Sequence, residues 1–169
     1  SPALERPDFT MLDMYGEPYD FLAETEGKLT YLFVGYTHCP DVCPIHMASI
    51  ASVLNQMPEY LDHVAVVFIT ADPERDSPER MQEWLRAFSP RFVGLRATEE
   101  ELRALESELG LPPSAVPVEA EGNYAVGHAA QVIAFSPHGP AHVVYPFGSR
   151  QADYANDLPR LMNDRWEEG

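Results

Sequence analysis

The segment 31–57 constrains the fold of this chain more than any other. A β-branched and aromatic run predicts a buried strand over Leu29–Gly35, and an apolar pattern at helical spacing follows it and stops at Pro58. The two cysteines of the chain, Cys39 and Cys43, lie between these patterns. Two thiols at a strand-to-helix junction can close a disulfide or hold a soft metal ion.

The remaining patterns predict an α/β layered fold with a central mixed sheet and helices beside it. A second fully apolar run predicts another buried strand over Val64–Thr70. The segment 111–122 contains three prolines and no periodicity, so we expect a long loop there. The other expected elements are an N-terminal hairpin of strands at 7–13 and 18–21, a strand at 92–95, a hairpin of 132–136 and 143–147, and helices after Ser77, after Thr98 and over 152–166.

Composition narrows the classes of partner. The net charge of −16 and the pI of about 4.5 argue against nucleic acid, because phosphates require a basic surface. The same charge is compatible with a basic protein partner. No apolar run approaches the roughly 18 residues that a membrane span needs. With 169 residues and neither repeat nor linker, we expect a single monomeric domain over 1–169.

The chemistry of the cysteine pair excludes some sites. Pro44 at the first helical position would place Cys43 at a helix N-terminus, where we expect a lowered thiol pKa. A disulfide that closes so short a loop adds little stability, and structural zinc usually takes four protein ligands. Two thiolates and one imidazole would form a soft site that suits copper(I) and also admits copper(II).

Six histidines compete for the third position. His46 lies three residues beyond Cys43, one helical turn away on the same side, so sequence proximity favours it. His38 directly precedes Cys39, and we assign it at most a supporting position around the ligands. His128 is distant in sequence, and spacing alone ranks it below His46.

Three separated motifs resemble a known family. The run YTHCPDVCP at 36–44 resembles the central motif of the SCO/SenC copper-chaperone family. DPERDSP at 72–78 is similar to its second motif, and YAVGH at 124–128 to its third, in which a tyrosine leads to the histidine ligand. Three motifs in the right order are far more specific than a lone CxxxC.

The resemblance implies a thioredoxin-like fold and copper bound by Cys39, Cys43 and His128, with His128 in place of His46. It also implies delivery of copper to the copper-binding subunit of cytochrome c oxidase, where the binuclear copper centre is assembled. The family acts at the extracytoplasmic (periplasmic) face of a membrane, usually through an N-terminal anchor, which we expect only of the parent protein. Another copper carrier or a thiol reductant would be a further partner.

Several other residues of the motifs have two interpretations each. Asp72 is either a turn or cap aspartate, or, by the resemblance, a residue at the copper face or the partner interface. Arg75 and Asp76 are expected to fix the same loop. Asp41, between the cysteines, either caps the helix or disfavours the thiolates by its charge. Tyr124 is either an aromatic wall of the site or a tyrosine at the edge of the core.

Two functions remain open on the sequence. The first is a metallochaperone, which needs few ligands and an open flank for an incoming thiolate. The second is a thiol–disulfide oxidoreductase that reduces the cysteines of the target, with Cys39 attacking and Cys43 resolving. The CxxxC spacing argues against the second, because thioredoxin-like reductases usually carry CxxC. A peroxidase ranks third, and a redox-gated chaperone would combine the first two.

Overall fold

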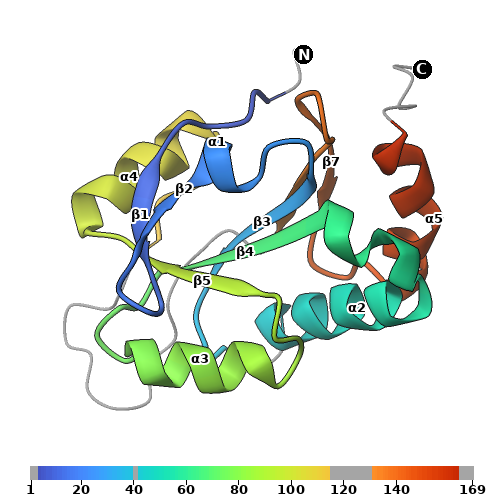
Figure 1. Ribbon diagram of the computed structural model, residues 1–169. Coiled ribbons are helices and arrows are strands. Elements are labelled where there is room, and N and C mark those ends of the chain that lie inside the picture. The colour runs from blue at the N-terminus through green and yellow to red at the C-terminus, as the bar shows by residue number, and fades with distance from the viewer. Residues whose placement is uncertain (1–3, 40–41, 115–130, 164–169) are drawn as a thin grey trace.

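In the computed structural model, which describes residues 4–39, 42–114 and 131–163, the strands form one mixed sheet. Within these ranges the sheet has seven strands in the order β2-β1-β5-β4-β3-β6-β7 (Figure 1). The elements are β1 Thr10–Asp13, β2 Pro18–Asp20, α1 Phe21–Glu24, β3 Leu29–Gly35, α2 Val42–Gln56, the 3-10 helix η1 Pro58–His63, β4 Val64–Thr70, α3 Pro78–Arg86, β5 Val93–Arg96, α4 Glu99–Glu108, β6 Val132–Phe135, β7 Ala141–Tyr145 and α5 Gln151–Met162.

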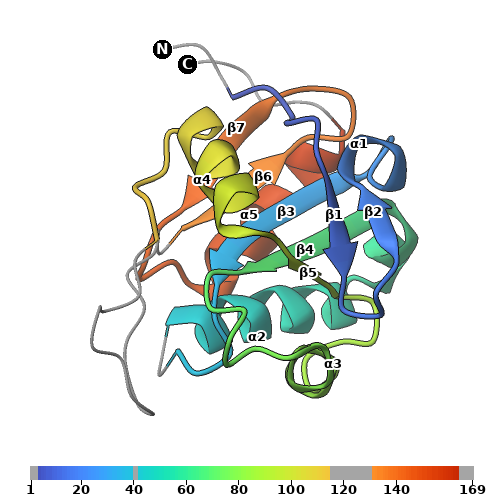
Figure 2. The same ribbon diagram turned by 90° about the vertical axis from the view of Figure 1, so that its left-hand side faces the viewer.

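The helices lie on both sides of the sheet. Figures 1 and 2 show α2 and α3 on one side of the central strands and α4 on the other. The helix α5 packs against α2 and covers Tyr31, whose ring lies 5.8 Å from that of Tyr154 between centroids. None of the helices in the described ranges is long and apolar enough to cross a membrane.

The central strands decide where the site lies. β3 pairs in parallel with β4 from Leu29 opposite Val64 to Gly35 opposite Thr70, and antiparallel with β6 on its other side. The bounds predicted for these two strands, Leu29–Gly35 and Val64–Thr70, are confirmed. Strands covered on both faces form nearly continuous apolar runs, so their ends can be read from the sequence. Since parallel strands end at the same edge of a sheet, the loops that follow β3 and β4 meet there.

The structure differs from the expected elements in several places. α2 begins at Val42, so Cys43 lies within its first turn, where Pro44 is also tolerated because no backbone N–H is required there. Pro58 ends the helical pattern of α2 as expected, but it also begins the 3-10 helix η1, which the sequence patterns do not predict. The one-turn helix α1 is likewise not predicted. The capping box of Thr98 and Glu101 at the start of α4 is confirmed.

The C-terminal elements are shifted in the same way. β7 ends at Tyr145, two residues before the expected end, and α5 ends at Met162 in the described range. Residues 115–122 of the expected loop lie outside the described residues. The remaining differences are shifts of one to four residues at element ends, where hydrogen bonding fades gradually.

The N-terminal segment is fastened to the sheet by one arginine. Leu4 forms an isolated antiparallel bridge with Ala141 at the start of β7. The Arg6 guanidinium donates to the carbonyl oxygens of Thr25, Lys28 and Ser136 and to the hydroxyls of Thr25 and Thr30, at 2.7–2.9 Å. Burial lowers the pKa of this guanidinium, but its hydrogen bonds compensate for much of the lost hydration.

We expect Arg6→Ala to lower the free energy of unfolding by about 3 kcal/mol, because it leaves buried acceptors without a donor. Arg91→Ala is the matched control, since Arg91 pairs with Asp62 on the surface and should change stability by about 0.5 kcal/mol or less. Urea denaturation measures both. Equal losses in the two variants would contradict the role of Arg6.

Candidate metal centre

The two cysteines come together at the carboxyl end of β3. Cys39 lies in the loop after the strand, where its backbone N–H donates to the Tyr36 carbonyl oxygen at 3.2 Å. Cys43 lies in the first turn of α2, and its backbone N–H points at the Cys39 Sγ at 3.4 Å. Both side chains are buried, and no disulfide joins the two sulfurs. Two soft sulfur donors at one strand-to-helix turn fit the donor preference of copper.

The end of β3 is shaped to receive the Cys43 side chain. A Cβ at Gly35 would lie 2.8 Å from the Cys43 Sγ and 2.9 Å from the nearest ring carbon of Phe33. Both distances are too short for real Cβ contacts, so a larger residue would push the sulfur away. Glycine is therefore needed here for close approach of the thiol to the strand.

The expected lowering of the Cys43 pKa is wrong. Burial raises the pKa of this thiol, and its interactions with the Cys39 side chain and with the negative charge of Asp76 add to the effect. The backbone of Tyr36 lowers the pKa, but by less than burial raises it. The helix N-terminus is outweighed because the Cys43 side chain is 0% exposed, so a thiolate there would lose nearly all hydration.

His46, which sequence proximity favoured as the third ligand, belongs to the core between α2 and α5. It is 2% exposed, and its Nδ1 lies 2.6 Å from the Tyr154 hydroxyl oxygen. Its ring also packs edge-on against Phe33, with centroids 5.3 Å apart. One ring nitrogen is therefore engaged with Tyr154, and the residue ties the cysteine-bearing helix to the C-terminal helix.

His38 lies on the other side of the cysteine loop. Its side chain is 38% exposed, and its Nδ1 lies 3.4 Å from the Thr37 hydroxyl oxygen and 3.7 Å from a carboxylate oxygen of Asp76. His38 is therefore part of the loop that carries Cys39 and contacts Thr37 and Asp76. Its supporting position around the metal ligands stays a prediction.

Three of the proposed site residues, Asp41, Tyr124 and His128, lie outside the described residues, so their roles stay predictions. In the parts of the chain that the structure does describe, no group of three or more His, Cys, Asp or Glu side chains is placed to hold a metal ion. The fit to copper consequently rests on the donor chemistry of Cys39 and Cys43.

The second motif forms the neighbouring loop, after β4. Asp72 is 1% exposed, and one of its carboxylate oxygens accepts from the Arg75 Nε at 2.5 Å. Its burial favours a role within the protein over contact with a partner. Arg75 also reaches back toward the cysteine loop, because its guanidinium carbon lies 5.8 Å from the centroid of the Tyr36 ring.

Asp76 links the two loops directly. Its carboxylate accepts from the backbone N–H of Thr37 at 3.0 Å and from the Thr37 hydroxyl at 2.5 Å. The sequence patterns predict that Asp76 fixes its own loop, and they include Thr37 only as a member of the motif at 36–44. The usable signal was the parallel order of the two strands, which places a polar residue after one beside the loop after the other.

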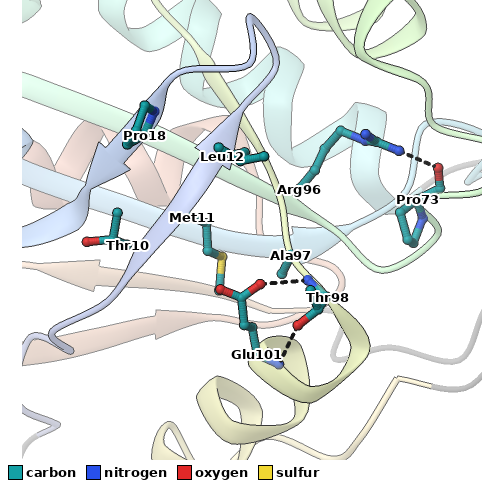
Figure 3. A pocket seen from close by; sticks show the side chains of 9 residues that line it. All are labelled: Thr10, Met11, Leu12, Pro18, Pro73, Arg96, Ala97, Thr98 and Glu101. Carbon is teal, nitrogen blue, oxygen red and sulfur yellow. Dashed lines mark hydrogen bonds between the residues drawn. The ribbon is translucent and has the colours of Figure 1, made fainter.

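A hollow of about 390 Å³ lies beside the loop that follows β4, between β1 and the start of α4 (Figure 3). Met11, Pro18 and Glu101 are among its lining residues. Figure 3 shows the Arg96 side chain reaching the Pro73 carbonyl oxygen, at 2.9 Å. The cysteines do not line this hollow, so it is separate from the candidate metal centre.

The raised pKa of Cys43 predicts weaker stability in alkali. The unfolded chain loses this proton near the ordinary thiol value of 9.0, while the folded chain retains it to higher pH. The contribution of the protonated Cys43 thiol to the free energy of unfolding is thus complete below about pH 9. Above that pH it is lost at up to about 1.4 kcal/mol per pH unit. Urea denaturation from about pH 8 to about pH 10 should show a steeper fall for the wild type than for Cys43→Ala. Parallel curves would contradict the assignment.

Known proteins are similar to this chain in both sequence and architecture. Residues 1–163 match the family model SCO1/SenC. The chain is 34% identical over 142 residues to the mitochondrial SCO2 homolog of Danio rerio, which covers 81% of this chain and 50% of that protein. It is 31% identical over 160 residues to the Homo sapiens homolog, covering 94% of this chain and 59% of that protein. The chain thus spans between one half and three fifths of the length of these two relatives.

Two copper-bound structures are similar to the whole described fold. ScoI of Bradyrhizobium japonicum is 31% identical, with a TM-score of 0.79 over 94% of this chain and 99% of that one. Yeast Sco1 is 25% identical, with a TM-score of 0.83 over 99% of this chain and 92% of that one. These likenesses confirm the thioredoxin-like fold, and the match over nearly all of its length means that the chain belongs to the SCO1/SenC family.

Proposed function

We propose that this protein is a copper metallochaperone that binds copper through Cys39, Cys43 and His128. It passes the ion to the copper-binding subunit of cytochrome c oxidase, for the binuclear copper centre. The observation that carries the proposal is the pair of thiols at the turn between β3 and α2 in a chain of the SCO1/SenC family. Copper bound to ScoI of Bradyrhizobium japonicum and to yeast Sco1 supports it.

The thiols suit copper(I), and an imidazole from His128 would admit copper(II) as well. Both thiols lose their protons when they bind the ion, so uptake releases protons to solvent. Because burial raises the pKa of Cys43, the affinity for copper should increase as the pH rises. The burial and the raised pKa of Cys43 keep this thiol of the metal-free protein resistant to indiscriminate thiol chemistry.

Transfer would proceed by ligand exchange. A thiolate of the receiving subunit attacks the ion, and one sulfur of this chain leaves. Cys39 is 8% exposed and Cys43 is 0% exposed, which supports Cys39 as the sulfur that is replaced first. The net charge of −16 is compatible with a receiving subunit that presents a basic face.

We place the single domain at the extracytoplasmic face of a membrane, held there by an N-terminal segment of the parent protein. The mitochondrial names of its SCO2 relatives are consistent with an energy-transducing membrane. Copper would arrive from another carrier, and a thiol reductant would keep the pair reduced.

The second candidate is reduction of a disulfide in the receiving subunit, in which Cys39 and Cys43 give up two protons and two electrons and become joined. The approach of the Cys43 backbone to the Cys39 sulfur favours ring closure. The burial of Cys43 opposes it, because a thiol with a raised pKa carries little thiolate at neutral pH. We therefore rank reduction below copper delivery.

Titration of the fully reduced protein with copper(I), against a competing chelator, tests the three ligands. We expect one tight equivalent for the wild type, none for Cys39→Ser, and an affinity reduced by at least about tenfold for His128→Ala. His46→Gln should bind as the wild type does. Tyr154→Phe is its control, because it removes the same hydrogen bond without altering α2.

The outcomes separate the site from the function. A large loss with His46→Gln but not with Tyr154→Phe would leave copper binding standing and overturn His128 as the ligand. Absence of tight binding by the wild type would refute the chaperone and favour the reductase.

A further inference from the structure

The cysteine loop is held by a buried carboxylate from the neighbouring loop. Asp76 is 0% exposed, and its carboxylate accepts three hydrogen bonds. Two come from Thr37, from the backbone N–H and from the hydroxyl, and the third comes from the Thr70 hydroxyl at 2.6 Å. A buried charge with several donors is fixed firmly, because each lost bond costs its desolvation.

Each partner of Asp76 is itself fixed by another element. The Thr70 hydroxyl also accepts from the backbone N–H of Asp72 at 3.0 Å. The Thr37 hydroxyl accepts from the Arg80 Nε of α3 at 3.1 Å. The network therefore joins the ends of β3 and β4 to the first turn of α3.

The backbone of Asp76 is secured from the opposite side. Its N–H donates to the Asp72 carbonyl oxygen at 2.9 Å, which closes the turn of the second motif. The Arg96 guanidinium donates to the carbonyl oxygens of Pro73 and Asp76, at 2.9 and 3.2 Å. These bonds hold the backbone of Asp76 independently of Thr37. Asp76 therefore provides a fixed attachment point for the cysteine loop.

We propose that Asp76 is the positioning residue of the cysteine pair. It fixes Thr37, two residues before Cys39, and so keeps the Cys39 sulfur beside the start of α2, where Cys43 lies. Without this hold, the loop samples more conformations and the two sulfurs meet less often in a productive arrangement. The effect should therefore appear in every reaction that needs both sulfurs together, with or without copper.

The chain offers variants that separate positioning from stability. Asp76→Asn has nearly the same shape, but it replaces one of the two accepting oxygens by an NH2 donor. Where this donor faces the Thr37 hydroxyl, the hydroxyl loses its acceptor and already accepts from Arg80. Thr37→Val removes the hydroxyl, and Thr37→Ser restores it. Thr25→Val is the control: Thr25 is another buried threonine, and its hydroxyl is bonded to Arg6 and Phe21 at the opposite end of β3.

The first readout is the equilibrium between the pair and a dithiothreitol redox buffer. Cys39 and Cys43 lose two protons and two electrons as their disulfide forms, and the ring disulfide of oxidised dithiothreitol is reduced to two thiols. We expect the constant for disulfide formation to fall about tenfold in Asp76→Asn and in the same direction in Thr37→Val. Thr37→Ser and Thr25→Val should stay within about twofold of the wild type.

The second readout is copper(I) affinity against a chelator, and this arm rests on the proposed function. We expect a loss of about tenfold in Asp76→Asn and none in Thr25→Val. Thermal denaturation of every variant supplies the stability for comparison. If Asp76→Asn does not fold, the comparison of Thr37→Val with Thr37→Ser decides.

A disulfide constant unchanged in both Asp76→Asn and Thr37→Val would overturn the proposal. So would an equal shift in Thr25→Val, because the effect would then follow stability alone. Failure of the wild type to bind copper would refute the proposed function, whereas the disulfide constants would still decide the role of Asp76.

Discussion

The site depends on the parallel pairing of β3 with β4. Their register runs from Leu29 opposite Val64 to Gly35 opposite Thr70, so both strands end at one level of the sheet. The loop with the cysteines and the loop with the second motif leave from that level and meet, although 39 residues separate Thr37 from Asp76. Because β3 is buried along its whole length, packing on both faces of the sheet holds this arrangement in place.

Burial gives the cysteine pair its chemical character. The thiol of Cys43 lies against the backbone of Gly35, and desolvation there outweighs the favourable field of the helix N-terminus. The result is a Cys43 thiol that keeps its proton until something displaces it. A soft cation can do so, because the sulfur–metal bond compensates for the cost of deprotonation. The same burial that limits thiol exchange is thus compatible with holding a metal.

Sequence reasoning succeeded where a short-range pattern determines the outcome. Both central strands and the capping box of α4 follow from local composition. One-turn elements such as α1 lack enough residues for periodicity to appear. The Cys43 pKa could not be derived, since it depends on tertiary burial. Nor could the bond between Thr37 and Asp76, because only the assembled sheet brings them together. Sequence proximity placed His46 at the site, but it missed the Tyr154 partner that α5 supplies.

The bridge between Leu4 and Ala141 determines where the N-terminal segment lies relative to the cysteines. Ala141 pairs with Phe135, which in turn pairs with Thr30 at the beginning of β3, whereas the cysteines follow the end of that strand. The five residue-to-residue steps from Thr30 to Gly35 span roughly 16 Å. Leu4 therefore lies at the end of β3 that is remote from the cysteines. Arg6 holds the segment there through its bond to the Ser136 carbonyl oxygen, so a partner that reaches the cysteines meets the end of the sheet remote from Leu4.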